Sequence, residues 1–236
     1  MQVLTKLFQK YQFTILLLSL LLNILLIPAI ASISSAQYPN IGRVALSASL
    51  TLLMFVAVFV TNTSRLTKGI ALLIMAPPIF IMWSRLEIIY NNWLYITQHL
   101  LVAVFLGLVT ISLIKYVFSC KKVTFDLMSA ALCAYLIIGF LWVSLYCVVE
   151  SVQPGSFLLP EDSLGAFIGH DQHGDLFSRQ LYFSFVTLLT LGYGDLVPVN
   201  SVARLLAITE AFVGQVFLVV LVARLVGTHV AQSLEK

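Results

Sequence analysis

Six long apolar stretches make up most of this chain, and they restrict its fold more than any other feature. They lie at about 13–33, 44–61, 69–86, 97–118, 127–149 and 202–227. A helix needs roughly 20 mostly apolar residues to cross a bilayer, and each stretch comes close to that length. Because 60% of the residues are hydrophobic and only 10% are charged, the composition is that of an integral membrane protein.

We therefore predict an all-α membrane protein with six transmembrane helices. Residues 1–118 are expected to form a four-helix transmembrane bundle, and residues 228–236 a short cytoplasmic tail too small for a ligand-binding domain. Pro77 and Pro78 predict a kink or a break in the third helix, unless neighbouring helices satisfy the freed carbonyls.

The N-terminal stretch also fits a signal peptide. Lys6 and Lys10 precede its apolar core, and Ala29 to Ala31 resembles a cleavage site. We favour a membrane helix, because the apolar run is longer than the roughly 7–15 residues of a signal core.

The distribution of Lys and Arg between alternate loops predicts the orientation of the chain. One side carries Lys6, Lys10, Arg65, Lys68, Lys115, Lys121, Lys122, Arg224 and Lys236, and the other carries Arg43, Arg85, Arg179 and Arg204. Because cytoplasmic loops hold the excess of basic residues, both termini are expected in the cytoplasm. The scattered positions of these residues do not indicate a nucleic-acid surface.

A short polar stretch lies between the last two apolar runs. Residues 187–195 read Thr-Leu-Leu-Thr-Leu-Gly-Tyr-Gly-Asp. Gly192 and Gly194 permit backbone conformations that are closed to residues with a Cβ, so successive carbonyl oxygens can point the same way. Aligned carbonyls can replace the hydration shell of a cation. The preceding residues 176–190, with Asp175 as N-cap, predict a re-entrant helix whose C-terminal end is partially negative.

Residues 127–227 resemble the pore domain of potassium channels, which has an outer helix, a pore helix, a Thr-x-Gly-Tyr-Gly-Asp filter and an inner helix. The residues that match this motif in order are Thr187, Thr190, Gly192, Tyr193, Gly194 and Asp195. The resemblance implies a filter from Thr190 to Gly194, with K+ sites at the carbonyls of Thr190, Leu191, Gly192 and Tyr193 and at the Thr190 hydroxyl. It implies a homotetramer, because one chain supplies one filter strand, and no cofactor other than the permeant K+.

The chain departs from the familiar pattern in three places. Leu191 stands where Val is usual, which puts conductance in doubt more than selectivity. Tyr182 and Phe183 replace the paired tryptophans of the pore helix, and Val186 occupies a position that is acidic in some relatives. We therefore expect Asp195 to bond to Tyr182. The expected supports of the filter are Asp195, Thr187 and Tyr182.

The last apolar stretch carries the candidate residues of the inner helix. Gly214 matches the glycine at which many relatives bend, although a small residue also serves close helix packing. Helical spacing places Gln215, Leu218 and Val222 on one face, where we expect them to line the cavity. Glu210 is a carboxylate within an apolar helix, which is a functional candidate by default. The alternative is a neutral, hydrogen-bonded Glu210 near the interface.

The connection at about 150–178 is expected to face outside. Its charged residues are all acidic: Glu150, Glu161, Asp162, Asp171 and Asp175. Acidic groups at a pore mouth raise the local cation concentration, although they also serve simply to keep a loop soluble. His170 and His173 in this connection are ligand types suited to a divalent metal, and a solvated loop is the simpler interpretation.

The first four stretches lack a voltage sensor of the usual kind. Voltage-gated channels with six spans carry an arginine at every third position of the fourth span, whereas Lys115 is the only strong base at 97–118 here. We expect a degenerate sensor-like bundle and weak or absent voltage dependence.

Taken together, these features predict a K+-selective channel that conducts passively and is not an enzyme. Its partners would be K+, the lipid bilayer and its own copies. The compact chain resembles prokaryotic channels, which implies a bacterial inner membrane. Two alternatives stay open: a weakly selective cation channel, and a non-conducting regulatory membrane subunit.

Overall fold

The computed structural model describes residues 2–34, 39–60, 65–84, 92–120, 123–158 and 172–234. Helices dominate this part of the chain, and two short strands pair with each other. The elements are α1 (Gln2–Ser34), α2 (Pro39–Val60), α3 (Arg65–Trp83), α4 (Asn92–Ser119), α5 (Phe125–Val152), β1 (Phe157–Leu158), α7 (Gln172–Leu188), β2 (Val197–Pro198) and α8 (Ser201–Leu234).

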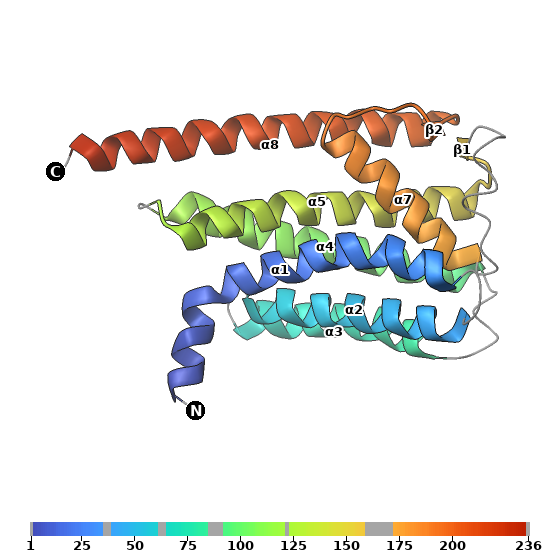
Figure 1. Cartoon of the computed structure of the whole chain (residues 1–236), viewed down its shortest axis with the longest axis horizontal. Coiled ribbons are helices and arrows are strands. Elements are labelled where there is room, and N and C mark those ends of the chain that lie inside the picture. The colour runs from blue at the N-terminus through green and yellow to red at the C-terminus, as the bar shows by residue number, and fades with distance from the viewer. Residues whose placement is uncertain are drawn as a thin grey trace.

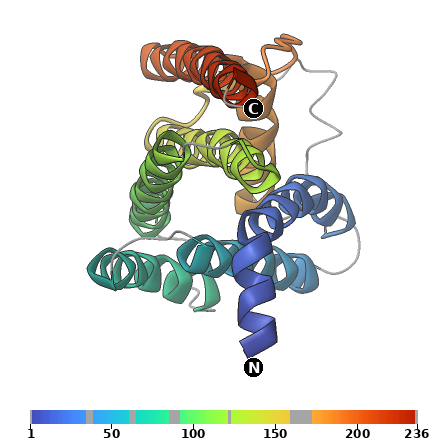
Figure 2. The ribbon, with the colours of Figure 1, turned by 90° about the vertical axis from the view of Figure 1, so that its left-hand side faces the viewer.

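The long helices lie side by side along one direction, and α7 crosses that direction obliquely (Figure 1). Seen along it, α8 forms one edge, α4 and α5 lie in the middle, and α2 and α3 lie at the opposite edge (Figure 2). The first turns of α1 point away from the rest of that helix (Figure 1), because the backbone at Tyr11 is not helical (φ −120°, ψ 18°).

Four of the described helices are long and apolar enough to cross a membrane. The spans are 11–29 in α1, 92–119 in α4, 125–152 in α5 and 201–228 in α8, with hydropathies of 2.1 to 2.3. Helices α2 and α3 hold shorter apolar segments, Val44–Val60 and Gly69–Trp83. The break expected in α3 is absent, since this helix continues through Pro77 and Pro78.

Helix α5 is the most enclosed of the four spans. In its most apolar window 61% of the residues are buried, against 17% in α8. Small buried residues such as Ala130, Ala131 and Ala134 let neighbouring helices approach α5 closely. Helix α4 packs along α5 of the same chain, and the link between these two helices is short.

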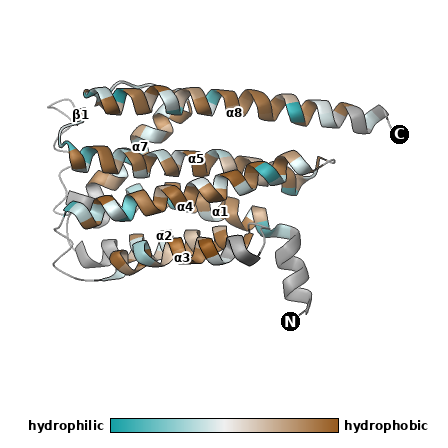
Figure 3. Ribbon diagram, turned by 180° about the vertical axis from the view of Figure 1, so that it is seen from behind, coloured by the Kyte–Doolittle hydropathy of each residue, from teal (hydrophilic) through white to brown (hydrophobic). Residues whose placement is uncertain are grey.

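Helix α8 contacts the other described elements along one side. Large apolar side chains on it remain exposed, among them Ile208, Phe212 and Val219. Figure 3 shows that hydrophobic residues continue along most of its length. A surface of this size and kind is normally covered by lipid or by other protein.

The two strands tie the chain after α5 to the chain before α8. Phe157 pairs with Pro198 and Leu158 with Val197 in antiparallel register. Asn200 caps α8, because its Oδ1 accepts a hydrogen bond from the backbone N–H of Ala203 at 2.6 Å. This pairing was not predicted, because two-residue strands carry no hydrophobic periodicity.

Candidate ion pathway

The segment from Thr190 to Gly194 has a backbone of alternating hand. Thr190, Gly192 and Gly194 have φ angles of 58°, 57° and 78°, whereas Leu191 and Tyr193 between them are not in this positive region. A change of hand at every second residue turns successive carbonyl groups toward the same side, which the uniform backbone of an ordinary strand does not do. Gly192 and Gly194 thus adopt backbone conformations that are closed to most residues with a Cβ, as the sequence predicted.

Thr190 adopts a conformation that the sequence did not predict. A positive φ costs a residue with a Cβ roughly 1–2 kcal/mol, and such outliers cluster at functional sites. Two backbone hydrogen bonds hold the turn: Thr190 N–H donates to the Thr187 carbonyl at 3.0 Å, and Leu191 N–H donates to the Val186 carbonyl at 2.9 Å. Thr187 therefore supports the start of the segment through its backbone.

The same segment is open on the side away from α7. The side chains of Leu191 and Tyr193 are 51% and 66% exposed. A Cβ added to Gly192 or Gly194 would meet no atom within 4 Å. Glycine is thus required there by backbone conformation and not by lack of space.

The predicted bond between Tyr182 and Asp195 is present. The Tyr182 hydroxyl donates to Asp195 Oδ2 at 2.5 Å, and the backbone N–H of Leu196 donates to Asp195 Oδ1 at 3.0 Å. The bond joins α7 to the chain just after residues 190–194.

Phe183, the neighbour of Tyr182, has a different environment. It packs edge-on against Tyr146 and Phe157, with ring centroids 5.1 and 5.0 Å apart. Such aromatic pairs add stabilisation beyond the burial of their area. Phe183 therefore anchors α7 to α5 and β1, while Tyr182 contacts the residue after the segment.

Glu210 lies where α5, α7 and α8 meet, and its side chain is fully buried. The Tyr146 hydroxyl donates to Glu210 Oε2 at 2.6 Å, and the Ser184 hydroxyl donates to Oε1 at 2.5 Å. Ser184 Oγ also lies 3.0 Å from the carbonyl oxygen of Gly139. The structure thus shows a Glu210 carboxyl that is enclosed by protein and hydrogen-bonded on both oxygens, and its functional role stays a prediction.

The end of α7 is held by two further contacts. The Tyr135 hydroxyl donates to the Leu188 carbonyl at 2.7 Å. A Cβ added to Gly214 would lie 2.8 Å from Cδ1 of Leu188, so α8 approaches α7 closely at this glycine. Helix α8 continues through Gly214 without interruption, and bending at this position stays a prediction.

The three residues expected to line the cavity differ in exposure. Gln215 and Val222 are exposed, whereas Leu218 is partly buried. Leu218 packs against the cluster of Tyr135, Ile138 and Leu188. In this chain, therefore, Gln215 and Val222 are open to a cavity or a neighbour, and Leu218 contacts α5 and α7.

One face of α5 builds most of the scaffold, and the sequence reasoning missed it. Tyr135, Gly139, Trp142 and Tyr146 recur every three or four residues, which places them on one side of a helix. Trp142 Nε1 donates to the carbonyl of Leu206 in α8 at 3.0 Å. A stripe of polar aromatic residues in an otherwise aliphatic span is the signal that would have found these partners.

The outer connection is described only in part. Residues 159–171, including His170, Asp171, Glu161 and Asp162, lie outside the described residues. Helix α7 begins at Gln172, so His173 and Asp175 lie inside its first turn and the N-cap predicted at Asp175 is wrong. The described residues include no group of three potential metal ligands, and the metal site stays untested.

Glu150 has a structural partner in this outer region. Its carboxylate accepts hydrogen bonds from the backbone N–H groups of Gly155 at 2.8 Å and Phe157 at 3.2 Å. Gly155 has a φ of 81°, and the carboxylate closes the turn that leads into β1. Glu150 therefore shapes the loop whether or not its charge also attracts cations.

Comparison with a protein family covers the same part of the chain. Residues 130–230 match the family described as ion channel. The chain is similar to Two-pore potassium channel 1 of Arabidopsis thaliana (37% identity over 84 residues, 36% of this chain and 21% of that channel). It is also similar to Two-pore potassium channel 4 of that plant (46% over 56 residues, 24% and 19%). A third relative is Protein LctB of Bacillus caldotenax (47% over 51 residues, 22% and 37%). No solved structure matches the chain.

The matched segments span only 19–37% of the length of these relatives. An ion channel domain moves ions and catalyses no reaction, which agrees with the prediction that the chain is not an enzyme. The apolar spans place it in a membrane. Residues 130–230 of this integral membrane protein thus match an ion channel family, and the resemblance to potassium channels that the filter motif predicted is confirmed.

Proposed function

We propose that this protein is a potassium-selective channel that conducts K+ passively through a filter formed by residues 190–194. The observation that carries this proposal is the alternating hand of the backbone at Thr190, Gly192 and Gly194. That backbone supports a row of carbonyl oxygens able to replace the hydration shell of K+. No cofactor is needed for this activity.

Helix α7 has the properties of a pore helix. Its 17 residues are fewer than the roughly 20 that a span requires, and it crosses the other helices obliquely (Figure 1). Its C-terminal end leads straight into Thr190 and carries the partial negative charge of the helix dipole. We propose that α7 enters the membrane from outside and that this end stabilises the entering cation.

We propose a homotetramer as the conducting unit. One chain supplies one strand of the filter, and a single strand does not surround an ion. The exposure of Leu191 and Tyr193 and of the apolar side of α8 supports further copies around the same axis, because these surfaces are not covered by their own chain. Gln215 and Val222 of each copy would line the cavity.

The remaining proposals concern the number of spans, the domains and the location. We propose six spans. Four are the long apolar helices, and the other two are α2 and α3, whose described apolar segments are shorter. The bundle of residues 1–118 would flank a pore domain at 127–227, with residues 228–236 as a cytoplasmic tail. Both termini would lie in the cytoplasm, and the proposed location is a bacterial inner membrane.

The test is K+-driven flux into liposomes that contain the purified protein, with Na+ as the competing ion. Gly192→Ala is the decisive variant, because Gly192 has a φ of 57° and open space around it. A Cβ there would act only through the backbone, at a cost of roughly 1–2 kcal/mol. Gly69→Ala is the matched control, since this glycine also has open space but lies in α3 without a positive φ.

The proposal expects K+ flux that excludes Na+, persists in Gly69→Ala and is lost in Gly192→Ala. Equal flux of both ions would replace it with the weakly selective cation channel, for which Leu191 is the departure from the usual filter. A folded tetramer that shows no flux at any tested voltage or pH would favour the non-conducting subunit.

A further inference from the structure

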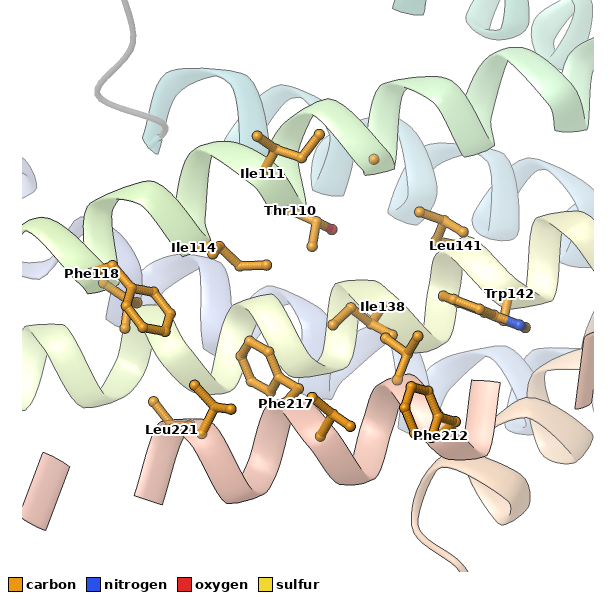
Figure 4. Close-up of a pocket in the computed structure, with 15 residues that line it drawn as sticks. Thr110, Ile111, Ile114, Phe118, Ile138, Leu141, Trp142, Phe212, Phe217 and Leu221 are labelled. Carbon is orange, nitrogen blue, oxygen red and sulfur yellow. The ribbon is translucent and has the colours of Figure 1, made fainter. Parts of the chain in front are cut away.

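An apolar cavity of about 430 Å³ lies between α4, α5 and α8 (Figure 4). Ile111, Ile114 and Phe118 of α4 face Phe217 and Leu221 of α8 across it. The polar atom of its lining residue Thr110 is already satisfied, because the hydroxyl donates to the Leu106 carbonyl of its own helix at 2.8 Å. The occupant of this cavity must therefore be a hydrocarbon chain or an apolar side chain.

A guanidinium lies at one end of the cavity. Arg224 of α8 is centred 4.8 Å from the ring centroid of Phe118, which lines the cavity. Its Nε donates to the Val117 carbonyl at 3.1 Å, and its Nη2 donates to the carbonyls of Phe118 at 2.6 Å and Cys120 at 2.9 Å. Arg224 thus caps the C-terminal end of α4, where helix carbonyls lack partners.

This arrangement leaves positive charge available at the end of the cavity. Among the described residues, the hydrogen bonds of Arg224 come from Nε and Nη2, so both hydrogens of Nη1 remain for a ligand. Lys115 is exposed and lies four residues after Ile111 and three before Phe118, which makes it a helical neighbour of two lining residues.

Acidic groups do not neutralise this end of the cavity in the described part of the chain. The sequences 92–120 and 211–234 contain no Asp or Glu. Asp126, at the start of α5, accepts a hydrogen bond from the Tyr116 hydroxyl at 3.4 Å. With Asp126 counted, the two cations Lys115 and Arg224 still leave this end with a net positive charge, which is complementary to an anion.

The depth of both cations suits a lipid headgroup. Lys115 and Arg224 each lie 23 residues after the first residue of their helix, which corresponds to about 34 Å of helix. A hydrocarbon core is about 30 Å thick. If the start of each helix lies at one interface, the two cations reach the headgroups of the other, cytoplasmic leaflet, where anionic lipids concentrate.

We propose that this cavity binds an anionic phospholipid. One acyl chain fills the space between α4 and α8, and the phosphate is bound by Lys115 and by Nη1 of Arg224. The bound lipid would fill the gap between the N-terminal bundle and α8. This site goes beyond the proposed function, and its occupation does not require that the protein conducts.

The test uses Trp142, which lines the cavity, as a reporter of the acyl chain. In a Trp83→Phe, Trp93→Phe background, Trp142 is the remaining tryptophan of the chain. Its fluorescence is measured in vesicles that contain brominated phosphatidylglycerol or brominated phosphatidylcholine, because bromine quenches tryptophan on contact. The full chain is used, and no ion gradient is applied.

We expect quenching to occur at a lower mole fraction of brominated phosphatidylglycerol than of brominated phosphatidylcholine. The two mole fractions should differ by about fivefold for each cation that contacts the headgroup. Lys115→Gln should reduce this preference, and Lys115→Gln with Arg224→Gln should remove it. Arg204→Gln is the matched control, because it removes a cation from the opposite end of α8. If Arg224→Gln fails to fold, Lys115→Gln alone still tests the preference, since the Lys115 side chain makes no hydrogen bond to another described residue.

Two results would overturn the proposal. Equal quenching by both lipids would show that an acyl chain enters the cavity without selection of the lipid headgroup. Absence of quenching by either lipid would show that the cavity is closed to lipid. A disulfide between two copies carrying Ile114→Cys, in a background without the native cysteines, would then identify a second copy as the occupant.

Discussion

Replacement of Glu210 is the most informative single perturbation, because its carboxyl joins three helices around the filter. In Glu210→Leu the side chain keeps a similar volume but loses both acceptor oxygens. Ser184 retains an acceptor in the Gly139 carbonyl at 3.0 Å, whereas Tyr146 loses the partner that lay at 2.6 Å. One buried hydroxyl is therefore left unsatisfied, which costs about 1–3 kcal/mol.

Glu210→Gln should behave differently, because the amide can satisfy every member of the network. Its carbonyl oxygen accepts from Tyr146, and its NH2 donates to Ser184 Oγ while Ser184 donates to Gly139. We expect Glu210→Gln to unfold within a few degrees of the unchanged protein. Glu210→Leu should unfold at a lower temperature, by about 2–4 °C for each kcal/mol lost.

The assay is thermal unfolding of the purified protein in detergent, combined with a double-mutant cycle. In a Tyr146→Phe background no hydroxyl is left unsatisfied, so Glu210→Leu should cost less there by about 1–3 kcal/mol. The flux of K+ against Na+, measured on the same samples, reports whether α7 still positions the filter. Equal unfolding temperatures for the Gln and Leu variants, or strict additivity in the cycle, would refute this account of Glu210.

Three further predictions concern Gly214, Tyr182 and the voltage dependence of conduction. Gly214→Ala should lower the unfolding temperature, because its Cβ would lie 2.8 Å from Leu188. Gly227→Ala, in the same helix but with open space, should raise it slightly, because alanine favours a helix more than glycine does. Equal effects in a melting assay would contradict the close packing at Gly214. Tyr182→Phe removes the donor to Asp195, and single-channel recording should show shorter openings or reduced K+ selectivity with unchanged assembly. The conductance-voltage relation in symmetrical K+ should be shallow, because the fourth span lacks a row of arginines; a steep relation would require another source of gating charge.

The sequence predicted those parts of the protein that depend on local chemistry. Long apolar runs indicated the spanning helices, and the glycines at 192 and 194 indicated the left-handed backbone. The bond between Tyr182 and Asp195 was predicted from the resemblance. It joins positions that are close in the chain, so the prediction needed no knowledge of distant contacts. These features need little knowledge of how distant helices pack.

The features that sequence reasoning missed depend on contacts between distant elements. Glu210 stood out as a carboxyl in an apolar helix, but its partner Tyr146 lies 64 residues away and is an ordinary membrane residue when seen alone. The positive φ of Thr190 comes from backbone bonds to Val186 and Thr187, which no residue preference for threonine indicates. The start of α7 was misplaced because Asp175 is a good N-cap by type, whereas the helix already begins at Gln172.

The polar contacts of α8 divide this helix into two fixed ends and a freer middle. Near the filter, the Leu206 carbonyl and Glu210 are bonded to α5 and α7, and at the other end Arg224 is bonded to the C-terminal end of α4. Between Glu210 and Arg224 the described contacts of α8 with other elements are apolar, and apolar contacts are not directional. Gly214 and the cavity both lie in this middle part. Any bend of α8 that leaves the filter intact is therefore expected here, and Arg224 would move the end of α4 with it.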